Sequence, residues 1–275
     1  MVKINLNLIK KNPLSLTSIL ANKLGIFKKY NIDMNLYLDE DFLFNGNIEF
    51  LEGRSDAMMG DTTFFFYMLE KGKRAVITSN LTRTINLVGG RELPENLDGL
   101  RVGVNRSGLF RLFLENDLKD IIRNPKIVWI NNTNDRIAAL NNGEIDALVA
   151  IEPFVSKVVN YGGKVIWNSR NSNKNLVMWC FDEDFYNKNP EVVGNFHKAL
   201  NEAAEIFNNS SDEEKVNYFM NFCDFPKEIA EGFRKFTFEI NGEYAKEDFD
   251  LCQEWMYREG EIKNLYNGEV LIQNK

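Results

Sequence analysis

Two turns carry side chains that could hold a small molecule. Asp61 is followed by Thr62 and Thr63, and Glu152 is followed by Pro153; each group stands directly after a short apolar run. A carboxylate there can accept a hydrogen bond from a ligand, but it can equally stabilise the positive end of the following helix by ~0.3–1 kcal/mol. Threonine hydroxyls are also good helix caps. These residue types therefore leave ligand binding and capping open as alternatives.

Further candidate residues stand at turns that follow predicted strands, where open α/β sheets bind ligands, and Trp179 stands on a predicted strand at 176–181 that crosses between lobes. A ligand at such turns would meet backbone N–H groups as well as side chains. Besides Asp61, Thr62 and Glu152, the candidate contacts are Asn12, Leu14, Asp41, Phe42, Gly60, Ser107, Gly108, Phe110, Thr133, Phe154 and Trp179. Ser107 is also a capping residue type, so capping is its alternative role.

This set predicts a flat ligand that carries N–H donors. Stacked aromatic side chains gain ~0.5–1.5 kcal/mol beyond area burial, and a hydrogen bond to a carboxylate such as Asp61 or Glu152 gains ~1.5–3 kcal/mol. Together they favour an amino-substituted heteroaromatic ring, such as a pyrimidine, over a small anion or an aliphatic sulfonate. A sulfonate calls for an arginine or lysine clamp, and the turns offer Arg83 and Arg106. If these two reach the ligand, the preference reverses.

Groups suited to catalysis or metal binding are sparse in the sequence. His197 is the single histidine, and it stands among apolar residues away from the serine turns, so a Ser-His-Asp set is not expected. The three cysteines, Cys180, Cys223 and Cys252, have no CxxC spacing. We therefore expect no metal site, no cofactor and no turnover.

Composition is that of an ordinary globular chain. The 275 residues are 44% hydrophobic and 27% charged, with a net charge of −7, which argues against a nucleic-acid partner. No apolar run approaches the roughly 18 residues of a membrane span. The first nine residues alternate like a strand and do not resemble a signal peptide. The protein is therefore expected to be cytoplasmic, or else to have lost a leader.

A sequence motif that occurs twice organises the elements around the candidate site. Residues 53–63 and 143–154 each contain a glycine that can end a helix, then Asp-Ala, a short apolar strand, and residues that open a helix. Around these copies, strands alternate with helices, which predicts mostly parallel sheets. Two crossing strands near 82–88 and 175–181 predict two lobes: residues 1–84 with 181–275, and residues 85–180.

Several motifs carry a resemblance to a known family. Residues 25–34 (GIFKKYNIDM) resemble the "G-hF-xx-GL-xV" segment of bacterial ABC-transporter substrate-binding proteins, with Asn31 in place of the usual glycine. Residues 97–104 (LDGLRVGV) resemble that family's entry to the second lobe, and residues 143–154 resemble its "G-x-hDA-xxxx-EP" signature. The chain is similar to the nitrate, sulfonate, taurine and thiamine-pyrimidine-precursor group, over nearly its whole length.

The resemblance implies an α/β, two-lobed type 2 periplasmic-binding-protein fold, with each mostly parallel sheet flanked by helices. It also implies an extracytoplasmic lipoprotein that captures a small molecule in an inter-lobe cleft by hinge closure and delivers it to ABC permease subunits. A monomer is expected. Two alternatives stay open: a sulfonate- or taurine-type binding protein, and a cytoplasmic pyrimidine-precursor enzyme on the same fold. The chain lacks the histidine and cysteine-rich motif that such an enzyme is expected to need.

Overall fold

The computed structural model describes residues 1–40 and 46–274, which form two compact units. Unit 1 comprises residues 1–82 and 175–275, and unit 2 comprises residues 83–174. The unit 1 sheet has the strand order β2-β1-β3-β10-β4. Its strands are β1 (Val2–Ile9), β2 (Ile32–Asp39), β3 (Ala57–Asp61), β4 (Ala75–Asn80) and β10 (Val177–Asp182). β10 runs antiparallel to both of its neighbours, whereas β1 pairs in parallel with β2 and β3.

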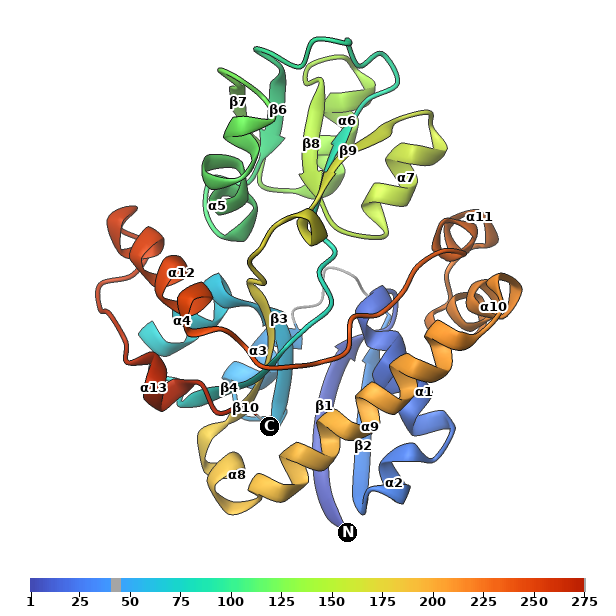
Figure 1. Ribbon diagram of the computed structural model, residues 1–275, viewed down its shortest axis with the longest axis vertical. Helices are drawn as coiled ribbons and strands as arrows, with labels where there is room; N and C mark the ends of the chain where they lie inside the picture. The colour runs from blue at the N-terminus through green and yellow to red at the C-terminus, as the bar shows by residue number, and fades with distance from the viewer. Residues whose placement is uncertain (41–45, 275) are drawn as a thin grey trace. The chain divides into compact units, whose positions relative to one another are not determined.

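The core of unit 1 forms between this sheet and two helices that cover it. One face of β1 buries Ile4, Leu6 and Leu8, as the alternation of its sequence dictates. Helices α1 (Leu16–Lys23) and α9 (Pro190–Asn209) pack together over this face (Figure 1). The remaining helices of unit 1 are α2 (Ile26–Lys29), α3 (Gly46–Leu51), α4 (Thr62–Glu70), α8 (Glu183–Lys188), α10 (Asp212–Cys223), α11 (Lys227–Ala230), α12 (Lys246–Arg258) and α13 (Gly268–Leu271).

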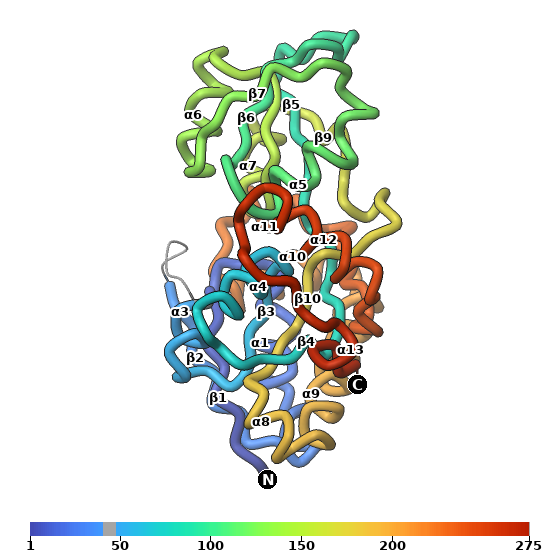
Figure 2. Tube along the Cα trace, turned by 90° about the vertical axis from the view of Figure 1, so that its left-hand side faces the viewer, coloured from blue at the N-terminus to red at the C-terminus, as the bar shows by residue number. Residues whose placement is uncertain are grey.

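The C-terminal segment closes one edge of the unit 1 sheet. Beyond α13, Ile272 forms a parallel bridge with Ile77 of β4, and the Gln273 N–H donates to the Ile77 carbonyl at 2.7 Å. Figure 2 shows this end of the chain beside α13 and β4. An unpaired edge strand presents free N–H and C=O groups. The last residues therefore protect β4 from pairing with another chain.

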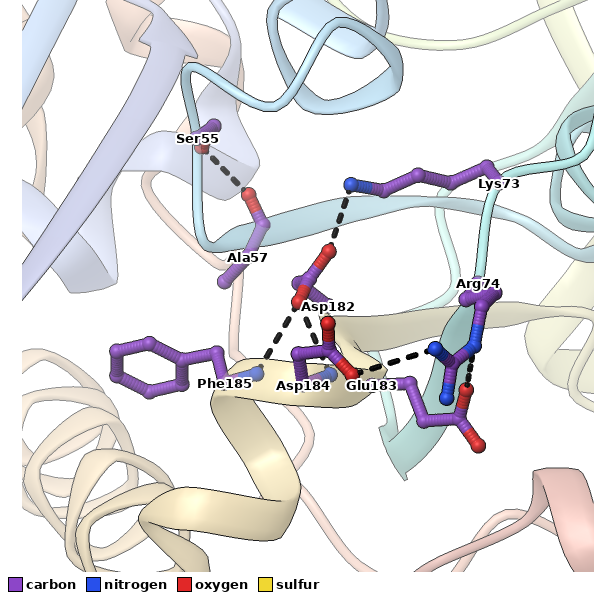
Figure 3. A network of polar contacts seen from close by, with 8 residues as sticks. All are labelled: Ser55, Ala57, Lys73, Arg74, Asp182, Glu183, Asp184 and Phe185. Carbon is purple, nitrogen blue, oxygen red and sulfur yellow. Dashed lines mark hydrogen bonds and ion pairs between the residues drawn. The ribbon is translucent and has the colours of Figure 1, made fainter.

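A polar network holds α8 at the start of β4 (Figure 3). The Lys73 ammonium lies 2.8 Å from the Asp182 carboxylate, and Asp182 also accepts the N–H groups of Asp184 and Phe185 as the N-cap of α8. Burial opposes ionisation of Asp182, but Lys73 and these N–H groups outweigh it, and on balance they lower its pKa. Arg74 adds an exposed ion pair with Glu183 at 2.6 Å. The network ties β4, β10 and α8 together.

Unit 2 repeats the strand order of unit 1 on a smaller scale. Its sheet is ordered β7-β6-β8-β5-β9, with β5 antiparallel to β8 and β9. The strands are β5 (Asn86–Gly89), β6 (Arg101–Val104), β7 (Lys126–Trp129), β8 (Ala147–Ala150) and β9 (Lys164–Asn168). The helices are α5 (Leu109–Asn116), α6 (Thr133–Asn141) and α7 (Phe154–Asn160). Two mostly parallel sheets flanked by helices confirm the predicted fold class.

The division between the units differs in detail from the prediction. The chain changes unit at 82/83 and 174/175, whereas the sequence placed the changes at 84/85 and 180/181. The reason is pairing: Trp179 of β10 lies opposite Met59 of β3 and Ser79 of β4. The whole of β10 therefore belongs to unit 1, and the loop before it makes the connection. In the described part of the chain, no helix is both long and apolar enough to cross a membrane.

Candidate functional site

Most candidate residues of unit 1 support their own turns. Asn12 caps the 3-10 turn Pro13–Ser15, because its Oδ1 accepts the Leu14 N–H at 3.0 Å. Leu14 is half-buried against the core. Gly60 is the half-buried penultimate residue of β3. Asp41 and Phe42 lie outside the described residues.

Capping and ligand binding were the alternatives for Asp61 and Thr62, and only Asp61 caps a helix. Asp61 caps α4: its Oδ1 accepts the Phe64 N–H at 2.9 Å and the Thr63 hydroxyl. Burial raises the pKa of the Asp61 carboxyl, although these hydrogen bonds oppose the shift. Thr62 is fully buried, and its Oγ1 bonds to the Leu176 carbonyl at 3.0 Å and the Tyr244 hydroxyl at 2.6 Å. Asp61 is therefore the cap of α4, whereas Thr62 links the start of α4 to the segments that contain Leu176 and Tyr244.

Trp179 lies in the core of unit 1. Its side chain is fully buried, and its ring packs edge-on against Phe196 of α9 with ring centroids 5.1 Å apart. The face of β10 that α9 covers could not be read from the alternation of the strand. Trp179 thus contributes apolar packing to this core.

In unit 2, the turn after β6 opens α5 with a glycine. Gly108, not Ser107, is the N-cap residue of α5, and its φ of +78° with ψ of −168° is a conformation that suits glycine. Ser107 precedes this cap residue and is exposed. Phe110 follows within the first turn and is half-buried. This turn presents an exposed hydroxyl and a partly exposed ring.

The turn after β8 carries the second carboxylate. The Oε2 of Glu152 accepts the Ser156 N–H at 2.9 Å, so Glu152 stabilises the start of α7. Burial raises the pKa of its carboxyl, with the hydrogen bonds from Ser156 opposing. Phe154 is buried beneath the Lys157 ammonium, which lies 5.2 Å from its ring centroid. Glu152 therefore has the same role in unit 2 as Asp61 has in unit 1.

Sequence reasoning missed the residue that organises the unit 2 turns. Arg136 of α6 is fully buried, and its Nη1 donates to the Ile130 carbonyl at 2.7 Å, to the Asn131 carbonyl at 3.1 Å and to Asn105 Oδ1. Its Nη2 donates to Thr133 Oγ1 at 2.7 Å. Thr133 is thus a partner of a buried guanidinium. An arginine within a polar helix gives no sequence signal of this role.

The two arginines named as possible clamps both belong to unit 2. Arg83 donates from Nη1 to the Ser172 carbonyl at 2.8 Å. Arg106 is exposed, and its guanidinium lies 5.5 Å from the Trp129 ring centroid. Its backbone N–H donates to Asn131 Oδ1 at 3.0 Å. Arg106 therefore stands at the carboxyl end of β6, beside the turn that Arg136 holds.

The remaining reactive side chains are buried in unit 1. His197 lies between Thr78 and Ser79 of β4, with Nε2 2.9 Å from the Thr78 hydroxyl and Nδ1 3.2 Å from the Ser79 hydroxyl. Burial lowers the pKa of His197 to about 3, and burial raises the pKa of the Cys180 thiol. Across residues 1–40 and 46–274, no group of three or more His, Cys, Asp and Glu side chains could hold a metal ion.

Comparisons with known proteins match structure, not sequence. No protein-family model matches the chain, and no curated protein matches it with significance. Solved structures do match. The periplasmic aliphatic sulphonate binding protein SsuA from Escherichia coli gives a TM-score of 0.81 at 13% identity, over 99% of this chain and 92% of that one. The periplasmic nitrate-binding protein NrtA from Synechocystis PCC 6803 gives 0.73 at 12% identity, over 98% and 84%.

An enzyme also shares the architecture. The desulfurization enzyme DSZB gives a TM-score of 0.64 at 11% identity, over 100% of this chain and 97% of that one. At such identities a shared fold does not carry a shared function. Both sheets have the same order, in which the antiparallel strand lies between the third and fourth parallel strands. This order and these likenesses show that the chain adopts the type 2 periplasmic-binding-protein fold.

Proposed function

We propose that the protein is an extracytoplasmic solute-binding protein of an ABC importer, and that its solute is a small organic anion of the sulfonate type. The strand order carries the proposal, because in both units it brings the carboxyl ends of parallel strands and the starts of helices to one edge of the sheet. Structural neighbours named for sulfonate and nitrate binding support the solute class. ABC permease subunits are the proposed partners.

The roles of the two carboxylates support an anion over the heteroaromatic ring that the sequence favoured. Asp61 and Glu152 each accept N–H groups at the start of their own helix, where the helix dipole partly compensates their charge. They therefore repel an anion less than free carboxylates would. Trp179, one of the four aromatic candidates with Phe42, Phe110 and Phe154, is buried in the core. An amino-substituted heteroaromatic solute remains the second candidate, favoured by the half-buried ring of Phe110.

A thermal-shift and calorimetric screen tests the proposed solute class. The panel contains butane-1-sulfonate, taurine, nitrate and 2-aminopyrimidine. A solute at one hundred times its dissociation constant stabilises the folded state by ~2.7 kcal/mol, which raises the melting temperature by about 5 °C or more for a chain of this size. We expect butane-1-sulfonate to give such a shift. Preferential binding of 2-aminopyrimidine would reject the anion and keep the binding function.

Two further measurements test for turnover and for closure of the two units. Incubation of the protein with the bound solute should return the solute unchanged by mass spectrometry, and a stoichiometric product would favour an enzyme. Solute binding is proposed to close the two units about their two connections, as ligand-driven population shifts do in hinged proteins. Small-angle scattering should then show a smaller radius of gyration with saturating solute. An unchanged radius would reject the closure mechanism.

A further inference from the structure

The guanidinium of Arg136 links two turns that follow neighbouring strands. Its Nη1 reaches Asn105, in the turn after β6, and the Ile130 and Asn131 carbonyls, in the turn after β7. The backbone at Arg106 reinforces this link, because its N–H donates to Asn131 Oδ1 at 3.0 Å. The planar fork of an arginine can bond several acceptors in fixed directions, which lysine cannot do. The relative placement of the two turns therefore depends on one side chain.

Among residues 1–40 and 46–274, no carboxylate balances the charge of Arg136. Its acceptors there are neutral, being two carbonyls, one amide oxygen and one hydroxyl. Its Nε is buried and has no hydrogen-bond partner among the described residues. Burial lowers the pKa of Arg136 to about 10, which still leaves it charged at neutral pH. By contrast, Arg101 of the same unit donates to both oxygens of Asp146.

Such a buried charge is costly for stability alone. Removing an ion from water costs several kcal/mol even after the protein relaxes, and apolar residues of similar volume often replace buried ions without loss. The hydrogen bonds of Arg136 offset part of this cost, but its net charge remains. The Arg136 guanidinium also lies 5.5 Å from the ring centroid of Phe110, in the first turn of α5. The buried charge therefore adjoins the turn that exposes Ser107.

A second cation strengthens the positive potential at this edge of unit 2. Arg106 is exposed and packs over Trp129, and no carboxylate pairs with it in the described part of the chain. Arg111 packs over the same ring but pairs with Glu115 at 2.7 Å. Fixed charges at a partly desolvated edge attract ions of opposite sign. A negative group at the start of α5 would thus meet Arg106, the helix dipole and the field of Arg136.

We propose that Arg136 is a positioning and specificity-determining residue of the solute site, an inference that rests on the proposed function. Its fork holds the turns after β6 and β7 in place beside the start of α5. Its uncompensated charge selects a solute whose negative group docks against this edge. The two roles separate experimentally, because lysine retains the charge without the fork, whereas glutamine and methionine remove the charge.

The test compares dissociation constants for two probes, butane-1-sulfonate and 2-aminopyrimidine, by calorimetry at fixed ionic strength. Arg136→Met should weaken butane-1-sulfonate binding about 10- to 100-fold and change 2-aminopyrimidine binding much less. Arg136→Lys should weaken the sulfonate less than Arg136→Met does and keep the preference for it. The control is Arg123→Met, which removes an equal charge from an exposed position before β7 and should leave both constants within about twofold.

Arg136→Gln serves as a second neutral variant if the methionine variant does not fold, since its amide can still bond a turn carbonyl. Circular dichroism establishes which variants are folded. An unchanged sulfonate constant in a folded neutral variant overturns the inference, as does an equal loss for both probes, which is a merely structural effect. Wild-type protein that binds only 2-aminopyrimidine overturns it too, with solute binding intact. Wild-type protein that binds neither probe, and neither taurine nor nitrate, rejects the proposed function itself.

Discussion

The two units solve one backbone problem in the same way. In unit 1, Asp56 exchanges hydrogen bonds with Asn5 in the middle of β1: Oδ2 accepts the Asn5 N–H at 2.7 Å, and the Asp56 N–H donates to the Asn5 carbonyl at 2.8 Å. In unit 2, Asp146 makes the same exchange with Arg101, with both distances at 2.8 Å. The glycine three residues earlier has positive φ in each copy. The repeated motif therefore starts the third parallel strand beside the first, β3 beside β1 and β8 beside β6.

The units differ in the environment of two cations with little exposure. Lys73 of unit 1 pairs with Asp182, whereas Arg136 of unit 2 bonds only neutral groups among the described residues. The comparison teaches that shared topology supplies the same strand ends and helix starts in both sheets, while a few side chains decide which sheet edge carries charge. Our proposal accordingly attributes solute selection to the charged edge of unit 2.

The largest expected effect is on stability, in a comparison of one tryptophan from each unit. Trp179→Ala removes a fully buried ring from the core of unit 1 and should lower the free energy of unfolding by ~3–5 kcal/mol. Trp129→Ala removes a half-buried ring of unit 2 that lies between Arg106 and Arg111, and should cost much less. Urea unfolding followed by circular dichroism measures both. Similar losses for the two variants would contradict the assignment of Trp179 to the core and Trp129 to the edge.

The second prediction concerns acid stability and His197. The imidazole is buried and its pKa is lowered to about 3, against roughly 6.5 in the unfolded chain, so folding favours the neutral form. Its contribution is therefore intact above about pH 6.5 and is lost as the pH falls toward 3. Between pH 7.5 and pH 5, the wild type should lose ~2 kcal/mol more stability than His197→Gln does. Parallel pH profiles for the two proteins would refute this contribution.

Figure 3 supplies the third comparison, between a buried and an exposed cation of unit 1. Lys73→Met leaves Asp182 without its ammonium partner and should lower stability by ~1–2 kcal/mol, since the lysine side chain is only 9% exposed. Arg74→Met breaks a pair whose arginine is 66% exposed, and should have the smaller effect. Thermal unfolding measures both. A larger loss for the arginine variant would show that the network does not depend on its buried pair.

The smallest expected effect is in a test of whether the two copies of the motif are equivalent. Asp56→Ala and Asp146→Ala each remove a carboxylate that accepts a strand N–H, and each should cost ~1 kcal/mol. The Arg101 side chain is 42% exposed, so its ion pair should add little to the loss in unit 2. Chemical denaturation should place the two losses within about 0.5 kcal/mol of each other. A markedly greater loss of stability in one unit would mean that the two copies of the motif are not equivalent.

Local patterns in the sequence were enough to predict the alternation of strands and helices. Gly53 and Gly143 end helices with positive φ, and the apolar runs that follow them form β3 and β8. These features depend on backbone preferences and on hydrophobic period, which act over a few residues. Capping was likewise foreseen as an alternative at Asp61 and Glu152, because the residue type and its position before a helix contain the information. The candidate contacts themselves remain predictions.

Only the tertiary structure decided which side chains these elements bury and join. β10 belongs to unit 1 because it pairs with strands far earlier in the chain, and α9 covers the face that carries Trp179. Arg136 meets Asn105 and Ile130 because β6 and β7 end at the same edge of the sheet. In contacts of this kind, the sequence around one residue does not identify the residue that it contacts. Their energy comes from burial and from hydrogen-bond geometry that exists only once the strands have paired.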